Sequence, residues 1–378
     1  MGTVLRLART YPRQDRQGIG LHCRYYALYS RRKSLILTKA MEAPPLPCRA
    51  DTVLREVAYS DIPAGAEKLG ALRLLKVGVT KLHGELVFLR AAMKLIREQP
   101  EKPTIIHVHS ANYVFAGLFL KMRHGIPLCL NFGGTEVMRA RKLWPYRFAF
   151  RRLDAGFYVA REMEKSLFQY MEPEQCVYTA NGYDPALFGD DGKERQKKIV
   201  AVGNLRWAKD YPVMIRAFAR IADSFPDHRL EIIGDGDDRP MLEALIRDLA
   251  LEGRVALVGY RTHREIRHAL NTAQLYLMSS KTEGLPKSMI EAMACGLPVV
   301  CTDVGDCAAV KRDAGVAVPA GDPEALARAV REVLSDPGRL EDLRRRALRR
   351  SRDFSWEKVS SLVENTYDRL EGIATQCS

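Results

Sequence analysis

The second half of this chain repeats one pattern: a short apolar run, a glycine-bearing turn and then an amphipathic segment. Apolar residues recur at three- and four-residue spacing in the amphipathic segments, for example after Asp210 and after Pro240. Alternating strands and helices imply parallel strands joined by right-handed helical crossovers. The pattern therefore predicts an α/β domain with a parallel sheet. Its expected strands are Ile199–Val202, Leu230–Ile233, Val255–Val258, Leu275–Met278, Pro298–Cys301 and Gly315–Val318.

The first half shows the same alternation less regularly. A first strand is predicted at Val4–Ala8, and a turn that contains Gly18 and Gly20 leads from it into a helix. The segment 182–198 mixes Gly, Asp, Pro and Lys without periodicity, which is typical of a linker. We therefore expect a domain boundary near residue 190. The other strands expected in this half are Leu35–Thr38, Ile105–Val108, Leu128–Phe132 and Gly156–Val159.

Composition excludes several classes of protein. With 378 residues, 47% of them hydrophobic and 28% charged, the chain is typical of a globular protein with two domains. No run of about 18 apolar residues occurs, and charged residues interrupt the first thirty, so neither a membrane span nor a secretory leader is indicated. We expect a cytoplasmic protein. The eight cysteines form no Cys-x-x-Cys pair and no Cys/His cluster, which argues against a disulfide framework and a structural metal.

The net charge of +13 is concentrated in the first half. Residues 1–190 hold 29 Lys and Arg against 17 Asp and Glu, whereas residues 191–378 hold 30 against 29. A one-sided basic surface attracts nucleic acid, an anionic membrane leaflet or a phosphorylated acceptor. No nucleic-acid-binding signature accompanies the charge, so no nucleic acid is expected as partner. The basic stretches 66–97 and 139–152 are either leaflet-binding surfaces or ordinary surface helices, and the sequence leaves both open.

The strongest functional motif spans residues 279–300, SSKTEGLPKSMIEAMACGLPVV, and directly follows an expected strand. Glu283 and Gly284 fall at the carboxyl end of that strand, where doubly wound sheets bind ligands. Pro286 suits the first helical turn, and the amides of Gly284, Leu285 and Lys287 are then expected at a helix N-terminus, where they are suited to phosphate oxygens. Glu291 is placed to accept from a ribose diol. The alternative reading is one loop carboxylate and one helix-surface carboxylate, and two glutamates alone favour it.

The residues that flank these glutamates resemble the signature of glycosyltransferase family 4 (group 1), which are retaining enzymes with the GT-B fold. The resemblance covers most of the chain, because further motifs occur in the family's order. These are His107-Val108-His109, Asn181-Gly182-Tyr183-Asp184, Val202-Gly203-Asn204-Leu205 with Lys209, Gly234-Asp235-Gly236, Val258-Gly259-Tyr260, Asp303-Val304-Gly305 and Phe354-Ser355-Trp356.

The resemblance implies two Rossmann-like domains that face a cleft. Residues 1–189 would bind the acceptor, residues 190–355 the nucleotide-sugar, and 356–378 would form a helix crossing back to the first domain. The implied reaction moves a hexose-type sugar from a nucleotide diphosphate sugar, with uridine as the expected base, to a hydroxyl of a lipid-linked or glycan acceptor. Because no carboxylate pair suited to double displacement is evident, we expect same-face attack assisted by the leaving phosphate. Peripheral attachment to the inner membrane face is compatible with this role.

Site residues follow from the resemblance, position by position. Glu283, Lys209 and His109 are the expected catalytic residues, and Lys209 also makes physical sense because a departing diphosphate gains negative charge. Read alone, His109 is more simply a hydrogen-bonded strand-end histidine, and the resemblance favours the functional role. Read from the residues alone, Gly18 and Gly20 are candidates to let the backbone approach the diphosphate or the acceptor, although a lone Gly-x-Gly is more often only a turn. The expected donor-binding residues are Gly203, Asn204, Arg206, Lys209, Gly234, Tyr260, Glu283, Gly284, Leu285, Pro286 and Glu291.

Two departures from the family pattern bear on the donor site. Asn204 stands where the family has arginine, with Arg206 as the candidate replacement, and Gly133-Gly134 stands where it has histidine-glycine. No metal or other cofactor is expected, because Asp235-Gly236-Asp237 belongs to a glycine turn rather than to a metal-binding Asp-x-Asp. Two rival functions remain open: a GT-B nucleotide-sugar epimerase or phosphorylase, and a basic scaffold with a degenerate donor site.

Overall fold

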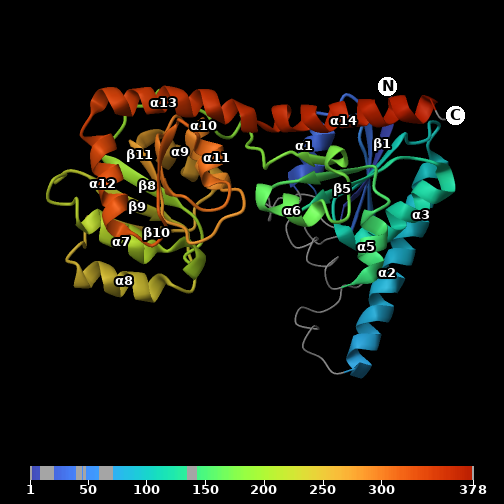
Figure 1. Cartoon of the computed structure of the whole chain (residues 1–378), viewed down its shortest axis with the longest axis horizontal. Helices are drawn as coiled ribbons and strands as arrows, with labels where there is room; N and C mark the ends of the chain where they lie inside the picture. Colours follow the sequence, from blue (N-terminus) through green and yellow to red (C-terminus); the bar gives the residue numbers. More distant parts are fainter. Residues whose placement is uncertain are drawn as a thin grey trace. The chain divides into compact units, whose positions relative to one another are not determined.

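The computed structural model of the chain describes residues 2–8, 21–39, 45, 48–58, 71–133 and 143–376. The chain divides into two compact units, each built around one parallel sheet (Figure 1). Unit 1 comprises Met1–Val159, Met163–Thr179 and Ser360–Ser378, and unit 2 comprises Ala160–Glu162 and Ala180–Val359. The α/β class predicted from the sequence is confirmed by these two parallel sheets.

Unit 1 contains a seven-stranded sheet in the order β3-β2-β1-β4-β5-β6-β7. All five strands predicted in the first half are present in it. The two others, β3 and β7, are the edges of the sheet, and most of their side chains are only partly buried. The strands are β1 (Thr3–Ala8), β2 (Lys33–Lys39), β3 (Val53–Val57), β4 (Ile105–Val108), β5 (Leu128–Phe132), β6 (Ala155–Tyr158) and β7 (Cys176–Tyr178).

Helices connect the parallel strands of unit 1, and most of the last helix of the chain also belongs to this unit. Helix α14 begins in unit 2 and belongs to unit 1 from Ser360 onward. Arg32, after the first helix, donates to three carboxylates of α14, which fixes that helix to unit 1. The helices are α1 (Leu21–Leu28), α2 (Ala71–Glu98), α3 (Val114–His124), α5 (Trp144–Phe150), α6 (Glu164–Leu167) and α14 (Trp356–Gln376).

Unit 2 contains a six-stranded sheet in the order β10-β9-β8-β11-β12-β13. Each of its strands lies within one residue of the position predicted from the apolar runs. Such agreement is expected because buried parallel strands are continuous apolar runs bounded by turns. The strands are β8 (Lys198–Val202), β9 (Arg229–Ile233), β10 (Val255–Gly259), β11 (Leu275–Met278), β12 (Val299–Thr302) and β13 (Gly315–Val318).

Helices cover the sheet of unit 2 on both faces. Alternate residues of β8 and β9, such as Ile199 and Ile232, pack into one core with α7, α8 and α12. Figure 1 shows β8, β9 and β10 between α8 on one side and α9 on the other. The helices are α7 (Tyr211–Ala219), α8 (Arg239–Asp248), α9 (His263–Thr272), α10 (Lys287–Ala294), α11 (Cys307–Lys311), α12 (Pro323–Leu334) and α13 (Pro337–Ser351).

Short 3-10 helices complete the described secondary structure. They are η2 (Ala111–Tyr113), η3 (Arg161–Met163), η4 (Pro173–Gln175), η5 (Trp207–Lys209) and η6 (Arg352–Phe354).

The segment interpreted as a linker packs against unit 2. Asp190 accepts hydrogen bonds from Arg195 at 3.1 Å and from Arg344 at 2.7 Å. Asn271 accepts from the amide of Asp191 at 2.9 Å. Unit 2 therefore takes up the chain from Ala180, ten residues before the boundary suggested by composition. The polar composition reflects side chains that anchor an irregular segment by hydrogen bonds.

Candidate active site

The order of strands in unit 2 creates one place where successive connections leave in opposite directions. After β8 the chain builds outward through β9 and β10, and it then returns to place β11 on the other side of β8. At such a switch point the two loops diverge and leave a crevice outside the carboxyl ends of the strands. Lys209 lies in the connection that follows β8, and Glu283 lies in the one that follows β11.

Lys209 and Glu283 meet at this switch point. The ammonium Nζ of Lys209 lies 2.5 Å from Oε1 of Glu283, and the hydroxyl of Ser280 donates to the same oxygen at 2.6 Å. The Glu283 side chain is 10% exposed and that of Lys209 is 27% exposed, so the pair is largely shielded from water. Two of the predicted catalytic residues, 74 positions apart in the chain, are thus in direct contact.

Backbone interactions hold the two loops together. The hydroxyl of Ser279 donates to the carbonyl oxygens of Lys209 and Asp210 at 2.9 and 3.0 Å, and the amide of Lys281 donates to Ala208 at 2.9 Å. Asp210 adopts a left-handed conformation with φ of 45°. This conformation ends η5 directly after Lys209 and starts α7, which fixes the position of the lysine side chain.

A third loop supports the backbone of Glu283. Gly305 has φ of +53°, and a Cβ at this position would lie 2.0 Å from the carbonyl oxygen of Glu283. The amide of Asp306 also donates to the carbonyl of Gly284 at 3.1 Å. Gly305 is therefore required both by its backbone conformation and by the close approach of the two loops.

Helix α10 starts one residue later than expected. Its first residue is Lys287, and Pro286 precedes it with extended ψ of 92° rather than lying in the first turn. Gly284 and Leu285 are partly buried in the loop that leads to it. The first amides of α10 still lack partners within the helix, so its start remains suited to anion binding.

Glu291 lies inside α10, one turn after Lys287. Burial raises the pKa of the Glu291 carboxyl to about 7, and the charge of Lys287 acts in the opposite direction. A carboxylate kept in such surroundings destabilises the empty site, so Glu291 stays a candidate for ligand binding.

The remaining predicted donor-binding residues lie on loops of unit 2. Gly234 has φ of +138°, and a Cβ there would lie 2.1 Å from the carbonyl oxygen of Gly203, so the loops after β8 and β9 touch through glycine backbone. Asn204 and Arg206 are exposed. Tyr260 is 71% exposed. Neither Asn204 nor Arg206 has a partner that fixes it among the described residues.

His109 belongs to unit 1 and follows β4, which neighbours β1 at the switch point of the seven-stranded sheet. Its Nδ1 lies 3.2 Å from Nδ2 of Asn131, and its Nε2 is buried and has no hydrogen-bond partner among the described residues. Burial, followed by the charges of His107 and Arg6, lowers the pKa of His109 well below its usual value. Gly18, Gly20 and Gly134 lie outside the described residues.

The acidic turn after β9 forms an ion pair with an arginine. Asp235 accepts from Arg239 Nε at 2.9 Å and from the amide of Gly236 at 2.8 Å, and its pKa is lowered, chiefly by Arg239. Across the described ranges, no group of three or more His, Cys, Asp or Glu side chains is arranged to hold a metal ion. Within the same ranges, no helix is long and apolar enough to span a membrane.

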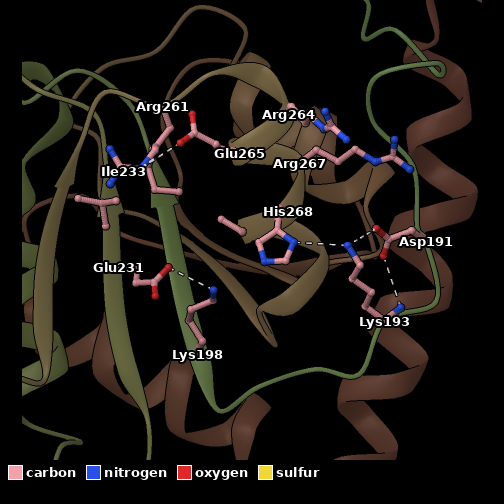
Figure 2. Close-up of a pocket in the computed structure, with 12 residues that line it drawn as sticks. Asp191, Lys193, Lys198, Glu231, Ile233, Arg261, Arg264, Glu265, Arg267 and His268 are labelled. Atoms are coloured by element: carbon pink, nitrogen blue, oxygen red, sulfur yellow. Dashed lines mark hydrogen bonds and ion pairs between the residues drawn. The ribbon is translucent and has the colours of Figure 1, made fainter.

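A separate cavity of about 790 Å³ lies between α9 and the strands β8, β9 and β10 (Figure 2). Several of the charges in it compensate one another, since Lys198 pairs with Glu231 at 3.2 Å and Lys193 with Asp191 at 3.1 Å. None of the predicted donor-binding residues is among the twelve that line it. Ile233 and Val258 at its edge directly precede the Gly234 and Gly259 turns.

Sequence reasoning missed the groups that support the site. Ser280 and Gly305 act through contacts with Glu283, and Asn131 acts through a contact with His109. Ser280 lies inside the motif that contains Glu283, and Gly305 lies inside the motif Asp303-Val304-Gly305, so both had a detectable signal, whereas Asn131 lies in no motif.

Comparison with known proteins agrees with this geometry. Residues 186–350 match the family model described as glycosyl transferases group 1, and residues 7–182 match the model described as glycosyl transferase 4-like domain. Together the two matches cover both halves of the chain.

Among curated proteins, the chain is 30% identical over 296 residues to N-acetyl-alpha-D-glucosaminyl L-malate synthase of Bacillus anthracis, which covers 71% of this chain and 75% of that protein. It is 24% identical over 294 residues to a phosphatidylinositol N-acetylglucosaminyltransferase protein of Arabidopsis thaliana. That match covers 74% of this chain and 64% of the plant protein, so the alignment spans less than two thirds of that relative.

Two solved structures share the fold over nearly the whole length. Sucrose-phosphate synthase from Thermosynechococcus elongatus superimposes with a TM-score of 0.73 at 18% identity, over 99% of this chain and 100% of that one. Anabaena HepE in complex with UDP and glucose gives a TM-score of 0.68 at 16% identity, over 97% and 100%. The predicted GT-B fold is confirmed. The chain belongs to the group 1 glycosyltransferase family, also known as glycosyltransferase family 4.

Proposed function

We propose that this protein is a retaining, metal-independent glycosyltransferase that moves a hexose-type sugar from a UDP-sugar to a hydroxyl of a lipid-linked or glycan acceptor. The observation that carries the proposal is the contact between Lys209 and Glu283 at the switch point of unit 2. A cation and a carboxylate held side by side there provide one group for the departing diphosphate and one for the hydroxyls of the sugar.

The charges of the two residues suit successive parts of the reaction. In the empty site, Lys209 neutralises Glu283. When a nucleotide-sugar binds, its diphosphate competes for the ammonium, and Glu283 keeps its hydrogen bond from Ser280 while it accepts from sugar hydroxyls. As the glycosidic bond breaks, negative charge grows on the diphosphate and strengthens its attraction to Lys209 and to the start of α10. Positive protein groups thereby replace a divalent cation.

Uridine as the base and a lipid or glycan as the acceptor are supported by related proteins. Anabaena HepE has been solved with UDP and with UDP-glucose. The Arabidopsis relative is named for phosphatidylinositol, and a Campylobacter jejuni relative, 32% identical over 137 residues, is named for a diphospho-undecaprenol acceptor. Lipid-linked acceptors place the reaction at a membrane surface.

Unit 1 carries an exposed apolar patch suited to such a surface. Trp144 is 73% exposed and Phe148 42% exposed on α5, and Phe119 and Met122 are 46% and 75% exposed on α3. The two helices pack together, with Phe115 and Tyr146 in an edge-to-face contact at 5.2 Å. Arginines on these helices or directly after α5 are exposed as well: Arg123, Arg147, Arg151 and Arg152. Aromatic side chains beside arginines favour an anionic leaflet.

The reaction is tested by nucleotide diphosphate release from UDP-, GDP- and ADP-sugars in the presence of EDTA, with and without a membrane-lipid extract. We expect release from a UDP-sugar that the extract stimulates, and a product that keeps the anomeric configuration of the donor. Conversion of the donor without any acceptor indicates the epimerase instead. Absence of both turnover and binding for every donor indicates the scaffold.

Membrane attachment is tested by sedimentation with vesicles of phosphatidylcholine alone or mixed with phosphatidylglycerol. We expect binding only to the anionic vesicles, weakened by salt and by the double change of Trp144 and Phe148 to Ala. The matched control changes Trp207 and Met241, which are 68% and 48% exposed in unit 2. Equal loss in both double variants contradicts a specific surface on unit 1.

A further inference from the structure

Unit 1 contains a buried chain of hydrogen bonds that ends at His109. It starts at Arg6 in the middle of β1, whose side chain is fully buried. Arg6 donates to the hydroxyl of Tyr367 at 3.0 Å, to Ser34 Oγ at 3.2 Å and to the carbonyl of Tyr26 at 3.0 Å. All three acceptors are neutral. A buried guanidinium can only donate hydrogen bonds, so it determines the direction of every bond that follows.

The first consequence concerns Tyr367, which α14 places against the sheet. Its oxygen accepts from Arg6 and lies 2.5 Å from Nδ1 of His107. Among the described contacts of Tyr367, Nδ1 of His107 is the one acceptor for the phenolic proton. Tyr367 must therefore donate, and Nδ1 of His107 must be the unprotonated nitrogen.

The second consequence passes through Asn131 on β5. Nε2 of His107 carries the ring proton and donates to the side-chain oxygen of Asn131 at 2.9 Å. The amide nitrogen of Asn131 then faces Nδ1 of His109 at 3.2 Å, and an amide nitrogen can only donate. Nδ1 of His109 is therefore an acceptor, and the proton of its neutral ring must lie on Nε2.

The surroundings keep both imidazoles neutral. Among the described residues, the titratable and charged groups around His109 are Arg6 on β1, His107 on β4 and His22 and Tyr26 on α1. None of them is an anion. Burial first, and then repulsion from Arg6 and the neighbouring imidazoles, lower the pKa values of His107 and His109 well below the usual value.

The end of the chain of bonds is a donor without an acceptor. Nε2 of His109 is buried and has no hydrogen-bond partner in the described structure, whereas Nδ1 is satisfied. A buried N–H without a partner costs about 1–3 kcal/mol, so its retention indicates a ligand that supplies the acceptor.

We propose that Arg6, Tyr367, His107 and Asn131 act as a positioning relay that holds His109 as a neutral hydrogen-bond donor, with its Nε2–H directed at an oxygen atom of the bound co-substrate. This inference rests on the proposed function for the nature of the ligand. The relay gives His109 the role of a donor and excludes it as a general base. It also gives α14 a function beyond packing, because Tyr367 delivers the proton that sets both tautomers.

The proton positions are measured directly by long-range ¹H–¹⁵N correlation spectra of the full chain labelled at histidine nitrogen, without any substrate. His107→Gln and His109→Gln spectra assign the two rings. At pH 8 we expect both rings to be neutral with the proton on Nε2. A proton on Nδ1 of His109, a mixture of tautomers or a charged ring would overturn the proposal. This experiment does not depend on enzymatic activity, so its failure is distinct from failure of the proposed function.

Asn131→Asp reverses the last step of the relay. A carboxylate cannot donate to His109, so the ring proton must move to Nδ1 and leave Nε2 as an acceptor. We expect kcat for sugar transfer to fall at least tenfold at pH 8. As pH falls, the ring gains a second proton beside the carboxylate, which restores Nε2–H, so the ratio of variant to wild-type activity should rise several-fold by pH 6. A loss that is equal at both pH values indicates a merely structural role and contradicts the relay.

Tyr367→Phe removes the proton that sets the tautomer of His107. We expect the spectra of both histidines to become tautomer mixtures in a folded protein. The matched control is Tyr158→Phe. Tyr158 is a buried tyrosine on β6, in the sheet that carries His107, and its hydroxyl donates a hydrogen bond to Glu164 at 2.7 Å. Unchanged tautomers in Tyr367→Phe contradict the proposed direction of the bonds.

Discussion

Replacing Glu291 by Gln is expected to stabilise the empty protein while weakening donor binding. The side chain lies in α10, where burial raises the pKa of the carboxyl from 4.5 to about 7. Above the folded-state pKa, the native state must hold a charge that the unfolded chain holds more easily. Glutamine copies the shape of the protonated acid and removes this cost.

The size of the effect follows from the change in pKa. A difference of one unit corresponds to about 1.4 kcal/mol, so the displacement of Glu291 corresponds to about 3 kcal/mol. Partial exposure of the side chain reduces the expected gain in the free energy of unfolding to about 1–2 kcal/mol at pH 8. The gain should shrink as pH falls from 7 toward 4.5, because the folded wild-type carboxyl then takes up a proton and no longer carries a buried charge, while the unfolded chain is still ionised.

Urea unfolding of wild type and variant at pH 8 and pH 5 measures the gain in the free energy of unfolding. Calorimetric titration with UDP measures the loss of affinity that we expect when the carboxylate for the ribose is removed. The exposed Glu252, changed to Gln, controls for the removal of one charge. A variant that is less stable than wild type at pH 8 would refute the reasoning about burial. A stabilised variant with unchanged nucleotide affinity would refute the ribose role.

Two further predictions concern the scaffold. Gly234→Ala should cost about 3 kcal/mol of unfolding free energy, because its Cβ would lie 2.1 Å from a carbonyl oxygen at φ of +138°. Gly372→Ala, in an exposed helical position with nothing within 4 Å, should instead stabilise by about 0.5 kcal/mol, and equal effects would contradict this account. Arg32→Ala should cost about 3 kcal/mol because it removes the 2.6 Å ion pair with the buried Glu364. Arg31→Ala, at a side chain 52% exposed, should cost less than about 1 kcal/mol in the same urea titration.

The sequence predicts the sheet of unit 2 better than the sheet of unit 1 for a physical reason. Strands of unit 2 are apolar runs between glycine turns, which simple periodicity detects. The missed strands β3 and β7 are short edges whose side chains are mostly part-exposed, so their pattern resembles that of loops. The segment 182–198 was interpreted as a linker because its composition shows polarity but not the partners of Asp190.

The candidate site, too, contains residues that the sequence predicts and residues that it does not. Glu283 and Lys209 lie in motifs at the ends of predicted strands, and the parallel topology brings those ends together. Arg6 interrupts an apolar strand, and its contact with Tyr367 joins residues 361 positions apart. A pairing of that kind depends on the returning helix, which leaves no periodic signal between the two residues.

The central claim is that Lys209 and Glu283 form the reacting centre. The direct test is the turnover of Lys209→Ala and Glu283→Gln with the donor that the wild type uses, measured beside Lys197→Ala and Asp227→Asn, which break an exposed ion pair of the same unit. We predict that each site variant remains folded and loses at least about tenfold in kcat, or about 1.4 kcal/mol, while the controls keep full activity. Normal turnover in both folded site variants would contradict the account.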